Sequence, residues 1–239
     1  MDAVPALDAA QAIVSDRYPN AVAAFLTGNA MTEPRESIST LDIIIILRGG
    51  PAPFRETMHE YGWLAELYVH TPASIDYFSK LEAKGYRATT ERMIVDGYIF
   101  LSVDGEAERI QTAAAKYLEG GPPQPSDDEI NNRRSLLTDQ LDDLQAASNQ
   151  TELLYIVGQL VIGVSELALL SKRHWLATGK WLPRHLNVSD PKLSTRLVQA
   201  TRSVMSEGEK EELEAIAREI LDRVGGPLPE EHLAEDVTL

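Results

Sequence analysis

Two hydrophobic patterns divide the chain near its middle. Before Gly120 the apolar residues form short runs typical of strands, at 22–27, 41–47 and 66–70. The strongest run is LDIIIIL, residues 41–47, whose consecutive isoleucines suit a strand buried on both faces of a sheet. After Ser126 the apolar residues recur with the 3.6-residue period of helices.

Further elements are expected between the strands of the first half. A helix is predicted to open the chain at 7–14, and another at 74–84. The runs 92–95 and 98–103 flank Asp96-Gly97, a dipeptide that tolerates the positive φ angles of a two-residue turn, which predicts a β-hairpin.

The second half reads as a set of helices. Ser126 with Glu129, and Ser206 with Glu209, have the spacing of capping boxes at helix starts. The periodicity predicts helices at about 127–147, 151–175, 190–205 and 206–224.

The segment GGPPQP, residues 120–125, separates the two patterns, because Gly and Pro sustain neither regular structure there. The predicted domains are residues 1–121, an α/β (α+β) domain with a mixed sheet, and residues 126–239, an all-α helical bundle.

Composition and charge exclude several classes of function. The 239 residues contain 22 Lys and Arg against 37 Asp and Glu, a formal charge of −15, which argues against general nucleic-acid binding. The absence of cysteine excludes disulfides, thiolate zinc sites and cysteine nucleophiles.

The acidic start MDAVPALDAAQAIV does not read as a secretory signal, so a cytoplasmic protein is expected. The apolar stretch 153–170 carries Gln159, Ser165 and Glu166, which predicts a buried core helix and no membrane span.

The most informative stretch is FLTGNAMTEPRESISTLDIIIIL, residues 25–47: a strand, a Gly-containing turn, a polar segment, and a second strand that begins beside an acid. It resembles the nucleotidyltransferase fold of the DNA polymerase β superfamily, particularly the small bacterial kind related to kanamycin nucleotidyltransferase. In that superfamily a Gly-Ser or Gly-Gly turn wraps the triphosphate. Two acids spaced by one hydrophobic residue open the next strand and hold Mg²⁺, and a third acid on a later strand ligates metal or helps to activate the acceptor hydroxyl.

The resemblance assigns roles to residues of the first domain. Gly28 and Asn29 would contact phosphates, since a turn without a side chain lets backbone N–H groups approach phosphate oxygens. Asp42 and Glu66 would hold the metal, and positions 40 and 42 share one strand face. In the preferred register Thr40 occupies the place of the first acid, so the acidic pair is half missing.

An alternative register makes Asp42 the first acid and puts Ile44 in the place of the second. That register leaves fewer apolar residues for the rest of the strand. In both registers one carboxylate of the family pattern is absent.

The second half also looks like the helical domain of this family, in RRSLLTDQLDDL, ELALLSKRHW and TGKWLPRHL. By resemblance, Lys180 and Arg184, which flank a Trp-Leu-Pro segment read as a loop, are candidates to contact the triphosphate.

A polar stripe runs along the longest predicted helix, since Glu152, Gln159, Glu166 and Arg173 recur every seven residues. If the stripe faces a cleft, Glu166 is a candidate general base; if it faces bulk solvent, it is the wet side of a bundle helix.

The resemblance implies an enzyme that transfers a nucleoside monophosphate from a nucleoside triphosphate, expected to be ATP, to a hydroxyl of a small molecule or protein, with Mg²⁺. The alternative is a catalytically inactive homologue that acts as a nucleotide-binding or protein-interaction module. Relatives are often dimers, which leaves a homodimer open.

Overall fold

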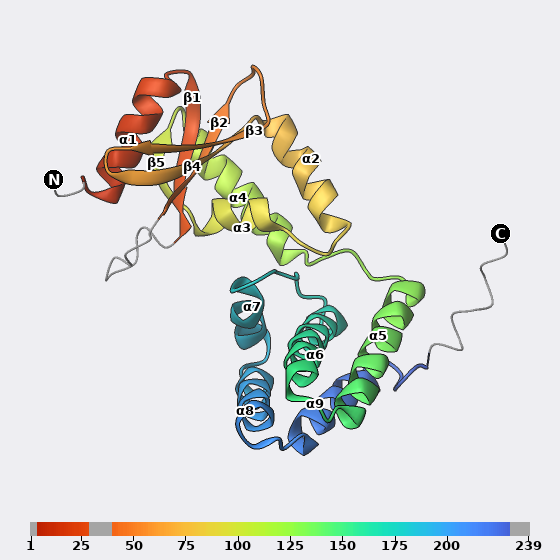
Figure 1. Ribbon diagram of the computed structural model, residues 1–239. Helices are drawn as coiled ribbons and strands as arrows, with labels where there is room; N and C mark the ends of the chain where they lie inside the picture. Colours follow the sequence, from red (N-terminus) through yellow and green to blue (C-terminus); the bar gives the residue numbers. More distant parts are fainter. Residues whose placement is uncertain (1–3, 29–39, 230–239) are drawn as a thin grey trace, which may run out of the picture. The chain divides into compact units, whose positions relative to one another are not determined.

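A computed structural model describes residues 4–28 and 40–229, in two compact units, Met1–Gly121 and Pro122–Leu239 (Figure 1). The elements of the first unit are α1 (Ala6–Arg17), β1 (Ala21–Thr27), β2 (Thr40–Leu47), β3 (Phe54–Glu60), β4 (Trp63–His70), α2 (Pro72–Ala83), α3 (Thr89–Asp96), β5 (Tyr98–Ser102) and α4 (Glu106–Glu119). Those of the second unit are α5 (Asp127–Ala146), α6 (Gln150–Ser171), α7 (Trp181–Ser189), α8 (Pro191–Glu207) and α9 (Glu211–Asp222). The predicted architecture, an α/β region with a mixed sheet followed by a region of helices, is confirmed.

The first unit is built on a mixed five-stranded sheet of order β3-β4-β2-β1-β5. Strands β2 and β4 run parallel, whereas the other neighbouring pairs are antiparallel. Ile43 and Ile45 belong to the core under α1, and Ile44 and Ile46 belong to the core on the other face, with residues of α3 and α4 (Figure 1). The run of isoleucines therefore lies in a strand covered on both faces, as the pattern predicts.

The predicted hairpin at Asp96-Gly97 is wrong. Asp96 ends helix α3, and β5, which follows Gly97, pairs with β1. Gly97 has a φ of −75°, so it does not form a positive-φ turn. Packing accounts for the glycine, because a Cβ there would lie 2.9 Å from the Cβ of Phe25.

The two capping signals of the second half have different outcomes. The Ser126 side chain accepts a hydrogen bond of 3.1 Å from the backbone N–H of Glu129 and caps α5 as predicted. The predicted cap at Ser206 is wrong, because α8 continues through Ser206 and ends where Gly208 adopts a φ of +78°. Gly208 is the glycine signal of a helix C-terminus, and it falls inside the helix predicted at 206–224.

Helix α6 is the most apolar helix of the second unit and packs against α5, α7, α8 and α9. By length and composition alone it could cross a membrane, but half of its most apolar 18-residue stretch is buried inside the protein. That burial is the behaviour expected of a bundle core helix.

Candidate functional site

The strand register places Asp42 directly beside Glu66. The two residues are partners across the parallel β2–β4 pair, so their side chains lie on the same face of the sheet. Thr27, the last residue of β1, is the partner of Asp42 on its other side. The structure thus brings Gly28, Asp42 and Glu66 together from three adjacent strands.

Gly28 is the tightest point of this site. Its φ is +78°, in the left-handed region that favours glycine. An added Cβ would collide with Oδ2 of Asp42 and lie 3.3 Å from its Cγ. The chain can turn beside the Asp42 carboxylate only because position 28 has no side chain.

The same face of β2 carries Thr40, Asp42 and Ile44, and its character changes along the strand. Ile44 is 1% exposed and belongs to the apolar core, whereas Thr40 is half-buried at the strand start. The polar end of this face is therefore at Thr40. This agrees with the preferred register, in which Thr40 and Asp42 occupy the places of the two acids. Asn29, the other residue expected at the phosphates, lies outside the described residues.

Glu66 already has a cationic partner. Arg55, on β3, donates to Oε2 of Glu66 at 2.6 Å, and the Tyr68 hydroxyl donates to the same oxygen at 2.9 Å. The Arg55 guanidinium also lies over the Tyr68 ring, 5.1 Å from its centroid. Burial, with the Glu66 hydrogen bond and charge, raises the pKa of Tyr68 to about 12, so the phenol remains a donor.

Sequence reasoning missed Arg55 because it missed β3. That strand runs along the sheet edge with most of its side chains exposed, so it lacks the alternation of apolar and polar residues that marks a half-buried strand. Only the pairing of Arg55 with Tyr68 across β3 and β4 shows that Arg55 reaches the site.

The donors fit one metal ion better than two. Within the described ranges, no group of three or more His, Asp or Glu side chains is suited to holding a metal. Mg²⁺ usually takes one or two carboxylates and completes its shell with water and nucleotide phosphates. Asp42 and Glu66 supply two carboxylates on one face, which fits a single Mg²⁺ ion shared with a nucleotide.

In the second unit, Glu166 forms an ion pair inside the helical bundle. Arg133 of α5 donates to Glu166 at 2.7 Å and to Glu129 at 2.6 Å. Glu152 and Gln159 are exposed on α6. The predicted extension of this helix and its stripe to Arg173 is wrong, because α6 ends at Ser171 and Arg173 has a φ of +55°. The described contacts of Glu166 are those of a helix-to-helix ion pair, and its role as a general base stays a prediction.

Lys180 and Arg184 flank one aromatic ring. The expected loop here is wrong, because α7 begins at Trp181 and contains Arg184. The Arg184 guanidinium lies 4.6 Å from the Trp181 ring centroid, and the Lys180 ammonium lies 5.9 Å from it. The two cations thus form a basic cluster around an exposed indole.

Comparison with solved structures finds a nucleotidyltransferase-like protein from Exiguobacterium sibiricum 255-15, which is 12% identical to this chain with a TM-score of 0.47. The match covers 91% of this chain and 73% of that one. No family model and no curated protein matches the chain. At this identity and TM-score the likeness assigns neither fold nor activity, so the site is judged on its own residues.

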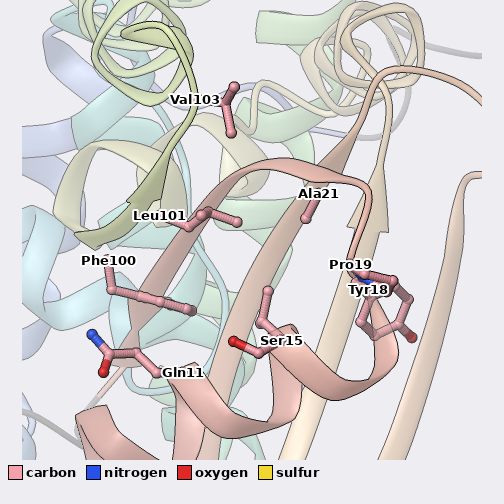
Figure 2. A pocket seen from close by; sticks show the side chains of 9 residues that line it. Gln11, Ser15, Tyr18, Pro19, Ala21, Phe100, Leu101 and Val103 are labelled. Atoms are coloured by element: carbon pink, nitrogen blue, oxygen red, sulfur yellow. The ribbon is translucent and has the colours of Figure 1, made fainter.

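A hollow of about 520 Å³ lies beside α1 and β5 (Figure 2). Gln11 and Ser15 of α1 and Phe100 of β5 line it, and none of the predicted site residues does. Its outline therefore gives no support to the predicted nucleotide site.

Proposed function

We propose that the protein binds a Mg²⁺–nucleoside triphosphate, with ATP as the expected nucleotide, and transfers the nucleoside monophosphate to a hydroxyl of a small molecule or protein. The observation that carries the proposal is the β2–β4 register, which sets Asp42 beside Glu66 at the Gly28 turn. Asp42 and Glu66 would hold Mg²⁺, which, when bound, supplies positive charge against the phosphates.

In this reaction the acceptor oxygen bonds to the α-phosphorus, and the bond between that phosphorus and the bridging oxygen breaks. Pyrophosphate leaves with the electron pair, and the hydroxyl proton passes to a general base. Gly28 and Asn29 would receive the phosphates through a turn in which backbone N–H groups can approach the phosphate oxygens.

A second candidate function is nucleotide binding without transfer. Two observations favour it: Thr40 stands where the family pattern has a carboxylate, and Arg55 pairs with Glu66. Both features reduce the negative charge available to metal ions.

The test is calorimetric titration of a non-hydrolysable ATP analogue, with and without Mg²⁺. The structure offers a matched control, because Glu56 accepts from Arg17 at 2.7 Å and from the Tyr18 hydroxyl at 2.9 Å, as Glu66 does from its own Arg and Tyr. Glu56 follows Arg55 on β3 and therefore points to the other face.

We expect Mg²⁺-dependent binding in the wild type and in Glu56→Gln, and its loss in Glu66→Gln and Asp42→Asn. Absence of binding to the wild type, or retention of binding in both site variants, would refute the proposal. Pyrophosphate release from ATP then separates the two functions. Binding without release, unchanged in Thr40→Asp, would favour the non-catalytic module.

A further inference from the structure

A separate cavity of about 280 Å³ lies within the first unit, between α2, α3 and α4. Its walls are largely apolar, with Ile75 from α2, Ile94 from α3 and Ile110 from α4. It shares no lining residue with the Asp42–Glu66 site. Apolar walls with a few converging polar groups are the usual features of a small-molecule site.

Glu91 lines this cavity and is the most deeply buried carboxylate of the described chain, at 2% exposure. Its Oε1 accepts a hydrogen bond from the Ser79 hydroxyl. Its Oε2 is fully covered and has no hydrogen-bond partner among residues 4–28 and 40–229. Buried polar atoms in folded proteins almost always have a hydrogen-bond partner, so an unsatisfied carboxylate oxygen beside a cavity indicates that a partner is missing.

The charges around the cavity favour a cation. Asp76 lines the cavity with Glu91, and both are acidic. Arg109 also lines it, but its guanidinium is bound by the Glu106 carboxylate and donates to the backbone oxygen of Asp104. The cavity's one lining cation is thus already neutralised, whereas the two acids leave a negative potential. Burial is the main cause that raises the pKa of Glu91; the hydrogen bonds from Ser79 and the backbone oppose it, and the charges of Glu82 and Asp76 add to it.

We propose that the cavity binds a small organic ammonium ion, whose apolar body packs against Ile75, Ile94 and Ile110 and whose N–H group donates to Glu91. Because Oε2 is covered, binding requires the Glu91 side chain to turn about its χ1 and χ2 torsions toward the cavity that it lines. The volume lies near the lower end of ligand pockets, so it fits a single ring or a short alkyl chain. This site is independent of the proposed nucleotide site, and its test does not require nucleotide.

The test uses the full chain and benzylamine at neutral pH, followed by NMR titration of backbone amides. Benzyl alcohol, which has the same ring without the charge, is the matched ligand. We expect saturable shifts at α2, α3 and α4 with benzylamine, and at least tenfold weaker binding of benzyl alcohol. Glu91→Gln, which keeps the shape of the side chain, should weaken benzylamine binding at least tenfold. Glu119→Gln, the same charge change at an exposed position of α4, should leave it unchanged.

Failure of the wild type to bind benzylamine, or equal affinity of wild type and Glu91→Gln, would overturn the proposal. Equal affinity for benzylamine and benzyl alcohol would also overturn it. Should Glu91→Gln fail to fold, Ala113→Phe provides the second variant, because Ala113 lines the cavity from an exposed position. A phenyl ring there should abolish binding, and retained binding would count against the site.

Discussion

Replacement of Gly28 by alanine tests the close approach of the β1 turn to Asp42. A non-glycine residue at a φ of +78° costs about 1–2 kcal/mol. The new methyl group would also displace the Asp42 carboxylate, and an off-rotamer side chain adds about 0.5–1.5 kcal/mol. We therefore expect Gly28→Ala to lower the free energy of unfolding of the first unit by about 2–3 kcal/mol.

Gly105 provides a matched control in the same unit. Its φ is +74°, but an added Cβ would meet only Nη1 of Arg109, at an ordinary contact distance of 3.6 Å. Gly105→Ala should therefore cost only the backbone term of about 1–2 kcal/mol. The excess cost of Gly28→Ala should disappear in an Asp42→Ala background, where the obstructing carboxylate is absent.

The assay is urea unfolding followed by fluorescence of Trp63, which is buried in β4. Substitution of Trp175 and Trp181 by phenylalanine removes the signal of the second unit, so that the transition reports the first unit alone. Equal destabilisation by Gly28→Ala and Gly105→Ala would refute the close-approach argument. So would an excess cost of Gly28→Ala that persists without the Asp42 carboxylate.

Two further predictions concern stability and its pH dependence. Asp190 caps α8 by accepting from the Leu193 N–H at 3.0 Å, so Asp190→Ala should destabilise the second unit by about 1 kcal/mol in urea unfolding at neutral pH. Although burial opposes it, hydrogen bonds from Lys172 and Leu193 lower the pKa of Asp190. The stability that the ionised Asp190 contributes is present above its unfolded-state pKa and is lost as pH falls through its folded-state pKa. The difference in free energy of unfolding between wild type and Asp190→Ala should therefore become smaller in acid. A difference that does not change with pH would contradict the pairing of Asp190 with Lys172 and Leu193. Burial raises the pKa of Glu91, so its folded form holds a proton more tightly, and wild-type stability falls as pH rises from the unfolded-state pKa to the folded-state pKa. Glu91→Gln should therefore gain stability relative to wild type between acid and neutral pH. If the free energies of unfolding of the two proteins, measured in urea, change with pH in the same way, burial does not raise the pKa of Glu91.

Local pattern by itself determined much of the fold. The runs at 22–27, 41–47 and 66–70 are strands, and the four isoleucines lie in a strand with both faces covered. In the second half, α5 and α8 begin and end within two residues of their predicted limits. These features depend on neighbours along the chain, through side-chain periodicity and the helix cap at Ser126, which are visible in one sequence.

The sequence pattern gave wrong predictions for short segments whose conformation depends on contacts with residues distant in the sequence. Residues 92–95 have the β-branched and apolar character of a strand, yet they form part of α3, where Ile94 fills the core beside the sheet. Gly97 reads as a turn residue, but the close approach of Phe25 is what requires it. Tertiary packing outweighs local preference in such short elements.

Some features of the candidate site could be found from the sequence, and others only from the tertiary structure. The sequence alone singled out Gly28, Asp42 and Glu66 as residues of interest, but only the parallel pairing of β2 with β4 made Asp42 and Glu66 neighbours. The Arg55 partner of Glu66, like the Arg133 partner of Glu166, is a long-range contact that no spacing along the chain indicates. Strand order and register arise from the packing of whole elements against each other, and for that reason the composition of the site was decided by the tertiary structure.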